Sequence, residues 1–192
     1  MTRMTLRAAV PLLALGLLAA GPARGAEALP PAELAKPGRV LMLRHALAPG
    51  TGDPAHFALG DCSTQRNLDA AGRAQAAELG KRLARAGVTG AKVYSSQWCR
   101  CLETARLLGL GRVAELPALN SLFGRPQNRA PQVAALRGFL AKLPADGPPV
   151  VLVTHQATIS AFTGHGVVSG GGVILALDGT GEPRVLGALA AN

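Results

Sequence analysis

Histidine side chains follow two short apolar stretches of the chain at the point where each stretch ends. Val40–Leu43 precedes Arg44 and His45, and Val150–Val153 leads through one threonine to His155. A run of four apolar residues of this kind is typical of a buried strand. In open α/β sheets the reactive groups gather beyond the carboxyl ends of the strands. Both histidines are therefore candidates for one common site.

A third strand end adds another cation. Residues 91–95 are predicted to form a strand and residues 98–108 a helix, so that Arg100 lies near the first turn of that helix. A helix N-terminus favours a nearby anion, and the planar fork of arginine matches the geometry of phosphate. A histidine at such a strand end can be a nucleophile, a base or a metal ligand. These residues indicate phosphate chemistry, although Arg100 could instead only pair with Glu103 or Glu115.

The three segments, in this order, resemble the histidine phosphatase superfamily, the relatives of phosphoglycerate mutase. The resemblance covers roughly residues 39–173 and includes residues 67–76, which are similar to a second family segment. It implies that His45 is the catalytic nucleophile and carries the phosphoryl group, and that His155 also takes part in catalysis. It further implies that the phosphate oxygens are bound by Arg44, Arg100 and His155. No metal or other cofactor is needed in this chemistry.

The usual positions for a general acid are not acidic in this sequence. Many members of the superfamily carry a glutamate in the loop after the third strand, where this chain has Leu119–Phe123; another branch carries an aspartate where Gln156 stands. The polar residues of the loop after His45 are possible contributors to the pocket: Asp53, His56, Asp61, Thr64 and Arg66. Asp53 and Asp61 are the candidate acids, and Asp53 is favoured because it is closer in sequence to His45. The alternative is a reaction without an acid, on substrates with acidic leaving groups.

Apolar strands that alternate with amphipathic helices predict an α/β domain over residues 39–192. The expected architecture is a three-layer sandwich, in which a largely parallel sheet carries helices on both faces. The predicted helices span residues 70–86, 98–108, 131–143 and 157–162, and residues 173–177 and 183–186 are predicted to form a terminal hairpin. Residues 46–66 are too rich in Gly, Pro and polar residues for regular structure, and they are expected to form one wall of the pocket. Residues 26–38 are predicted to be an irregular lead-in.

Residues 1–25 have the pattern of a signal peptide. Arg3 and Arg7 precede the apolar run 8–20, and small residues near Gly25 offer a cleavage site. We therefore expect an exported and periplasmic protein, without stable membrane insertion after cleavage. The alternative is a retained membrane anchor.

The cysteine content agrees with export. Three cysteines in an exported protein suggest one disulfide and one remaining thiol. We expect Cys62, in the loop, to pair with a cysteine next to Arg100. Cys99 is favoured over Cys101 because it lies on the polar face of the predicted helix, which a surface loop meets more easily. The alternative is three buried thiols.

Charge and composition narrow the classes of function. The net charge is +9, and removing the three arginines of residues 1–25 leaves +6, which favours anionic partners. Aromatic residues make up 3% of the chain and do not alternate with basic ones, so nucleic acid is not an expected partner. Neither a CxxC nor an HExxH pattern is present, so no metal site is expected.

The predicted function is an exported phosphomonoester hydrolase that works through a phosphohistidine intermediate. Its expected partner is a phosphorylated small molecule or an envelope glycan. An exported branch of the superfamily that includes lipopolysaccharide core heptose phosphate phosphatases is similar in layout, which suggests an envelope sugar phosphate. The alternatives are a non-catalytic phosphate-binding protein of the same fold and a phosphotransferase or mutase. The sequence makes no prediction about the oligomeric state.

Overall fold

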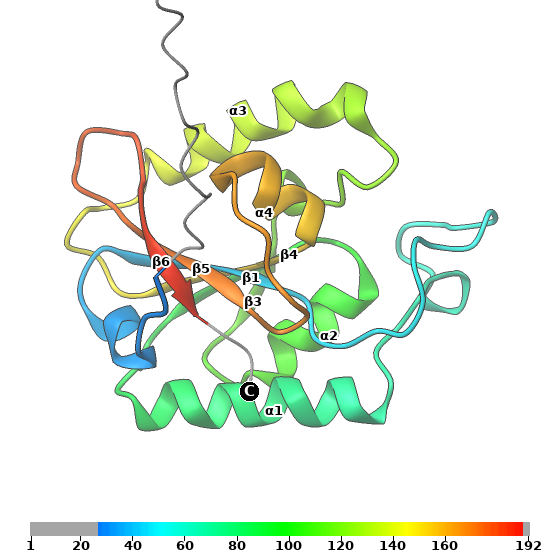
Figure 1. The fold of residues 1–192 in the computed structure, drawn as a ribbon, viewed down its shortest axis with the longest axis horizontal. Coiled ribbons are helices and arrows are strands. Elements are labelled where there is room, and N and C mark those ends of the chain that lie inside the picture. Colours follow the sequence, from blue (N-terminus) through cyan, green and yellow to red (C-terminus); the bar gives the residue numbers. More distant parts are fainter. Residues whose placement is uncertain (1–26, 190–192) are drawn as a thin grey trace, which may run out of the picture.

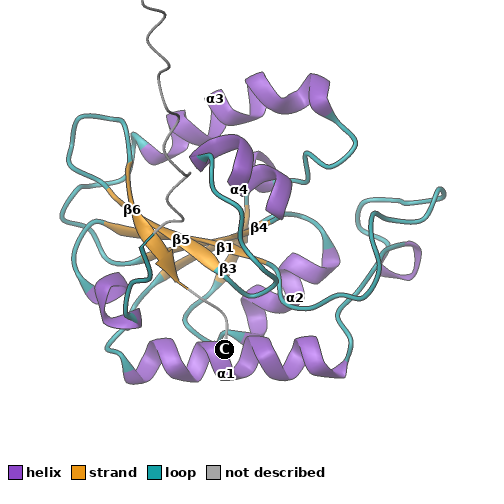
Figure 2. Cartoon of the chain, in the orientation of Figure 1, coloured by secondary structure: helices purple, strands orange, loops and turns teal. Residues whose placement is uncertain are grey.

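The computed structural model describes residues 27–189 (Figure 1). The predicted signal peptide, residues 1–25, lies outside the described residues. A six-stranded sheet occupies the middle of the molecule, and helices cover both of its faces (Figure 2). This confirms the predicted three-layer α/β architecture. None of the helices within residues 27–189 is long and apolar enough to cross a membrane.

The sheet is parallel over four strands and antiparallel at one edge. The strands are β1 (Arg39–Arg44), β2 (Lys92–Ser95), β3 (Val113–Glu115), β4 (Val150–Thr154), β5 (Gly172–Ala176) and β6 (Arg184–Leu189), in the spatial order β3-β2-β4-β1-β5-β6. The first four strands of this order run parallel to one another. β5 is antiparallel to β1 and to β6, so the terminal hairpin forms as predicted.

Two helices cover each face of the sheet. The helices are α1 (Ala70–Arg85), α2 (Cys99–Leu107), α3 (Arg129–Leu140) and α4 (Gln156–Thr163). On one face Leu41 and Leu43 of β1 pack in a cluster with residues of α1 and α2. On the other face Val40 and Met42 pack with residues of α3 and α4. β1 is therefore buried on both sides, which explains its uninterrupted apolar run.

Local sequence explains how α1 begins and how closely it packs. Asp69 caps the helix, because its carboxylate accepts a 2.7 Å hydrogen bond from the backbone N–H of Gly72. Gly80 faces the end of α2, where a Cβ atom would stand only 2.0 Å from the carbonyl oxygen of Leu108. A side chain at this position would push α1 away from α2, the helix that carries Arg100.

The lead-in and the third helix differ from their predictions. The lead-in is not wholly irregular, because Pro31–Ala35 forms a 3-10 helix and Ala28 forms a bridge with Ala188 of β6. α3 begins at Arg129 and ends at Leu140, earlier at both ends than predicted. Pro131 lies inside the first turn of α3, where the missing N–H of proline leaves no intrahelical hydrogen bond unmade.

Candidate active site

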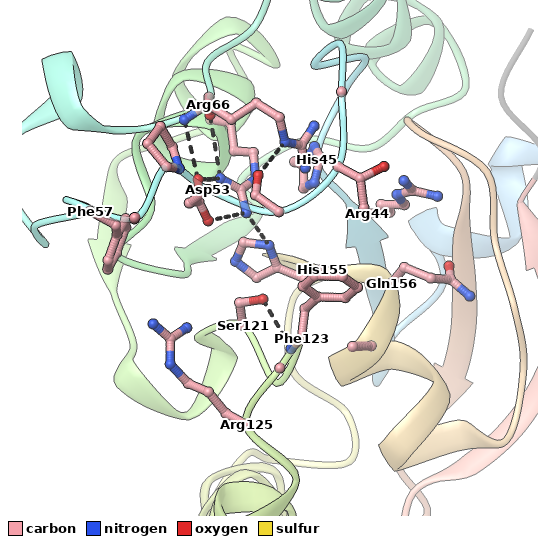
Figure 3. Close-up of a pocket in the computed structure, with 18 residues that line it drawn as sticks. Arg44, His45, Asp53, Phe57, Arg66, Ser121, Phe123, Arg125, His155 and Gln156 are labelled. Atoms are coloured by element: carbon pink, nitrogen blue, oxygen red, sulfur yellow. Dashed lines mark hydrogen bonds and ion pairs between the residues drawn. The ribbon is translucent and has the colours of Figure 1, made fainter.

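The register of two central strands brings the two histidines together. Arg44 of β1 is the partner of Thr154 in β4, and the backbone N–H of His45 donates a 2.9 Å hydrogen bond to the carbonyl oxygen of Thr154. His45 and His155 therefore leave the sheet side by side, with ring centroids 5.4 Å apart (Figure 3). Both side chains are buried. The predicted meeting of the two strand ends is confirmed.

His45 is held as a neutral imidazole with one nitrogen available for attack. Its Nδ1 lies 2.8 Å from the carbonyl oxygen of Ala46. A carbonyl oxygen can only accept, so Nδ1 carries the proton and Nε2 keeps its lone pair. Burial lowers the pKa of His45 to about 3, and the positive charges of Arg100, Arg66 and Arg44 act in the same direction. At neutral pH the side chain is therefore unprotonated at Nε2.

His155 has the opposite tautomer. An N–H of Arg100 lies 3.4 Å from Nδ1, so Nδ1 accepts and Nε2 carries the proton. The Nε2–H group then donates to the hydroxyl of Ser96, 2.9 Å away, and that hydroxyl donates in turn to the Asn120 side chain at 3.2 Å. Burial, followed by the neighbouring His45 and the arginines, lowers the pKa of His155 well below its ordinary value. This chain of polar groups fixes the ring plane of His155.

Three arginines from different segments of the chain converge on the histidines. Arg44 ends β1 and Arg66 belongs to the loop after β1 (both labelled in Figure 3), and Arg100 lies in the first turn of α2. Burial lowers the pKa of both Arg44 and Arg66, and the charge of Arg100 adds to the effect. The buried Nε atoms of Arg44 and Arg100 have no hydrogen-bond partner. Partly desolvated guanidinium groups with N–H donors to spare are strong binding groups for a phosphate.

Asp53 lies in the cavity as predicted, but it is ionised in the unliganded protein. Its carboxylate oxygens lie 2.7 and 3.2 Å from the guanidinium of Arg100. They also accept hydrogen bonds from the indole N–H of Trp98 and the backbone N–H of Arg66. Burial alone would raise the pKa of Asp53, but the hydrogen bonds and charge of Arg100 outweigh it and lower the pKa. Asp53 can donate a proton only after it has taken one up.

Asp61 is wrong as a candidate acid. Its side chain caps the short 3-10 helix Cys62–Thr64, where it accepts hydrogen bonds from the backbone N–H and the hydroxyl of Ser63. Asp61 is exposed and does not line the cavity that contains His45. His56 and Thr64 are also absent from the cavity lining. The side chain of Asp61 stabilises its own turn, because an Asp side chain in a loop readily accepts a hydrogen bond from the backbone N–H two residues further along.

The predicted disulfide is present. Cys62 and Cys99 are bonded, and Cys101 is a buried free thiol. The bond ties the loop after His45 to the start of α2, one residue before Arg100. Burial raises the pKa of the Cys101 thiol to about 12, so this side chain stays neutral beside His155.

We expect a variant with both Cys62→Ser and Cys99→Ser to lose stability. The disulfide joins residues 37 positions apart, and loss of a cross-link of this size costs roughly 2–4 kcal/mol of unfolding free energy. Chemical denaturation of the variant and of the untreated protein measures the difference. A reducing agent should destabilise the untreated protein by a similar amount and leave the variant unchanged. Equal stability of the two proteins would show that the bond does not constrain the loop.

The cavity has more lining residues than the sequence analysis predicted. It has a volume of about 540 Å³ and also receives side chains from the loop between β3 and α3. The lining residues that carried no predicted role include Phe57, Ser121, Phe123 and Arg125. For the last three, the sequence signal was that the family places an acid in this loop, whereas Phe57 belongs to residues 46–66, which were expected to form a wall of the pocket. Within residues 27–189, no group of three or more His, Cys, Asp or Glu side chains is arranged to hold a metal ion.

Known proteins share part of this sequence pattern and the overall fold. Residues 40–123 match the histidine phosphatase superfamily (branch 1). The protein histidine phosphatase SixA, solved with tungstate, superposes with a TM-score of 0.60 at 19% identity, over 80% of this chain and 97% of the other. A mycobacterial glucosyl-3-phosphoglycerate phosphatase, solved with VO3, gives 0.56 at 20% identity, over 77% and 95%. A phosphoserine phosphatase from Entamoeba histolytica, with 3-phosphoglyceric acid, gives 0.57 at 15% identity, over 79% and 96%.

Comparison with curated proteins gave no match in sequence. The matched segment nevertheless contains Arg44, His45 and Arg100, and the shared fold extends over four-fifths of the chain. The chain is therefore similar to the histidine phosphatase superfamily in sequence over residues 40–123 and in fold over most of its length.

Proposed function

We propose that the protein is a member of the histidine phosphatase superfamily and a phosphatase that works through a phosphohistidine intermediate on His45. The observation that carries the proposal is the state of His45: a buried, neutral ring whose Nδ1–H is bound to a carbonyl. His45 lines a cavity that is also lined by four arginines and His155. A nucleophile in a cationic, partly enclosed site is suited to attack on phosphorus.

In the first step, Nε2 of His45 attacks phosphorus in line with the leaving oxygen. The bond between nitrogen and phosphorus forms while the bond to the leaving oxygen breaks, and that oxygen receives a proton as an alcohol. In the second step, water attacks the phosphoryl group, and inorganic phosphate and free His45 are formed. Both steps place negative charge on the same equatorial oxygens.

The cationic residues around His45 stabilise that charge. Arg44, Arg66 and Arg100 provide N–H donors from three separate segments, so they can surround the phosphoryl group. A bound phosphate raises the pKa of His155, because a nearby negative charge favours the imidazolium form. Once protonated at both nitrogens, His155 can donate to a phosphate oxygen while it keeps its bond to Ser96. These positive groups are in place before the reaction begins, so the protein needs no reorganisation to stabilise the transition state.

We further propose that the enzyme acts outside the cytoplasm on a phosphorylated sugar of the cell envelope. The signal-like pattern of residues 1–25 and the disulfide between Cys62 and Cys99 support this proposal, because structural disulfides persist in oxidising compartments. The excess of positive charge in the chain also suits an anionic envelope component.

The proposal is tested with the purified protein and 4-nitrophenyl phosphate. We expect steady release of inorganic phosphate in the presence of a metal chelator. Rapid quenching at alkaline pH, which preserves phosphohistidine, should trap one phosphoryl group on the peptide that contains His45. Mass spectrometry of the digested protein locates it. Absence of turnover on a broad set of phosphomonoesters would instead favour a binding protein that has lost catalysis.

A further inference from the structure

A second positive group lies in the cavity, away from the arginines that surround His45. Arg125 belongs to the loop between β3 and α3, and its guanidinium lies over two aromatic rings. It is 5.6 Å from the ring centroid of Phe57 and 5.3 Å from that of Trp98. Figure 3 shows Arg125 and Phe57 on one side of His155, and His45 on the other. The cavity therefore has cationic groups at two separate places.

The guanidinium of Arg125 has no acidic partner. Across residues 27–189 its contacts are those with the two rings, and it makes no salt bridge or side-chain hydrogen bond. The rings of Phe57 and Trp98 are themselves stacked, with centroids 5.0 Å apart and planes 18° from parallel. Contact with an aromatic face fixes the plane of a guanidinium and leaves the N–H groups at its edge free to donate. Arg125 is thus oriented but not neutralised.

The charges that line the cavity exceed what one phosphate requires. The charged lining residues are Arg44, Arg66, Arg100, Arg125 and Asp53. Four arginines and one aspartate leave three unbalanced positive charges, whereas a phosphate dianion supplies two negative ones. The cavity volume of about 540 Å³ also leaves space beyond the phosphoryl group for the rest of a small substrate. One positive charge is left over, and in Figure 3 Arg125 lies on the opposite side of His155 from His45.

We propose that Arg125, supported by Phe57 and Trp98, is a second anion-binding subsite, and that the substrate carries a second anionic group on the part that is released. This inference rests on the proposed phosphatase function and narrows its substrate class. A neutral sugar with a single phosphate would leave the subsite empty. A phosphorylated sugar acid, or a sugar with a second phosphate, would fill it.

The test compares aryl phosphates that differ in one para substituent. 4-Carboxyphenyl phosphate carries the second anionic group, and 4-carbamoylphenyl phosphate is its neutral analogue of nearly equal size. The amide withdraws electrons more strongly, so leaving-group chemistry alone would favour the amide. We expect the native protein to prefer the carboxylate by about tenfold or more in kcat/KM, as for a charge-assisted hydrogen bond. 4-(Phosphonomethyl)phenyl phosphate carries a phosphate-like second group, and its kcat/KM is compared with that of the neutral analogue in the same way.

The variant Arg125→Gln should remove the preference, so that the ratio of the two kcat/KM values falls to about one or below. Arg129→Gln is the matched control, because Arg129 is exposed and does not line the cavity; it should keep the native ratio. An unchanged ratio in Arg125→Gln, or no preference for either anionic analogue in the native protein, would overturn the subsite. Failure of the native protein to hydrolyse any of these esters would instead contradict the proposed phosphatase function.

Discussion

Replacement of His45 with alanine is expected to lower the turnover of 4-nitrophenyl phosphate by more than about 1,000-fold, because removal of the nucleophile in another covalent enzyme costs on the order of a millionfold. His45 is the side chain whose Nε2 is free while its Nδ1 is bound to a carbonyl. No cation of the cavity can replace it as an electron-pair donor to phosphorus. The measurement is kcat together with the yield of trapped phosphoprotein, and both should fall to background.

A control histidine separates loss of the nucleophile from a general effect of histidine removal. His56 is exposed, belongs to the same loop segment and does not line the cavity. His56→Ala should therefore keep native turnover. Thermal unfolding of His45→Ala checks that the fold persists, because among the described residues the His45 ring forms a hydrogen bond only with the carbonyl of Ala46. If the His45→Ala protein were folded and had native turnover, the nucleophile would be His155 or another group.

The central part of the fold could be predicted because its apolar pattern has a single explanation. β1 and β4 are buried on both faces, so their continuous apolar runs identify them as interior strands of a parallel sheet. Parallel strands place their carboxyl ends at one edge of the sheet, so His45 and His155 could be expected at the same edge. The disulfide was predictable because the face of a helix can be deduced from its sequence, which distinguishes Cys99 from Cys101.

The rest of the site depends on loops, whose path does not follow from periodicity. Asp53 and Asp61 are both acidic residues of one irregular segment, and the sequence ranks them only by distance from His45. In the structure Asp53 meets Arg100 and Trp98 of another segment, whereas Asp61 bonds to its own neighbour Ser63. The place of Arg125 in the site could not be predicted either, because it depends on contacts with aromatic rings from the loop after β1 and the start of α2.

The remaining prediction concerns the proton that the leaving group requires. Asp53 is the one carboxylate that lines the cavity, and in the unliganded protein its negative charge is balanced by Arg100. A phosphate that binds Arg100 weakens this pairing and adds a negative charge beside Asp53. Both changes raise the pKa of a carboxyl group. We therefore expect Asp53 to take up a proton when substrate binds and to transfer it to the leaving oxygen.

Asp53→Asn should therefore lower kcat/KM for alkyl and for aryl phosphates to very different extents. A positioned acid contributes about 10²–10⁴-fold to the rate, and we expect a loss of this order in kcat/KM for glycerol 2-phosphate. The loss for 4-nitrophenyl phosphate should be far smaller, because 4-nitrophenolate leaves without a proton. Asp61→Asn is the matched control, since Asp61 is exposed and outside the cavity, and it should change neither rate. If Asp53→Asn slowed both esters equally, Asp53 would act only by orienting Arg100, and the leaving group would depart without an acid from this loop.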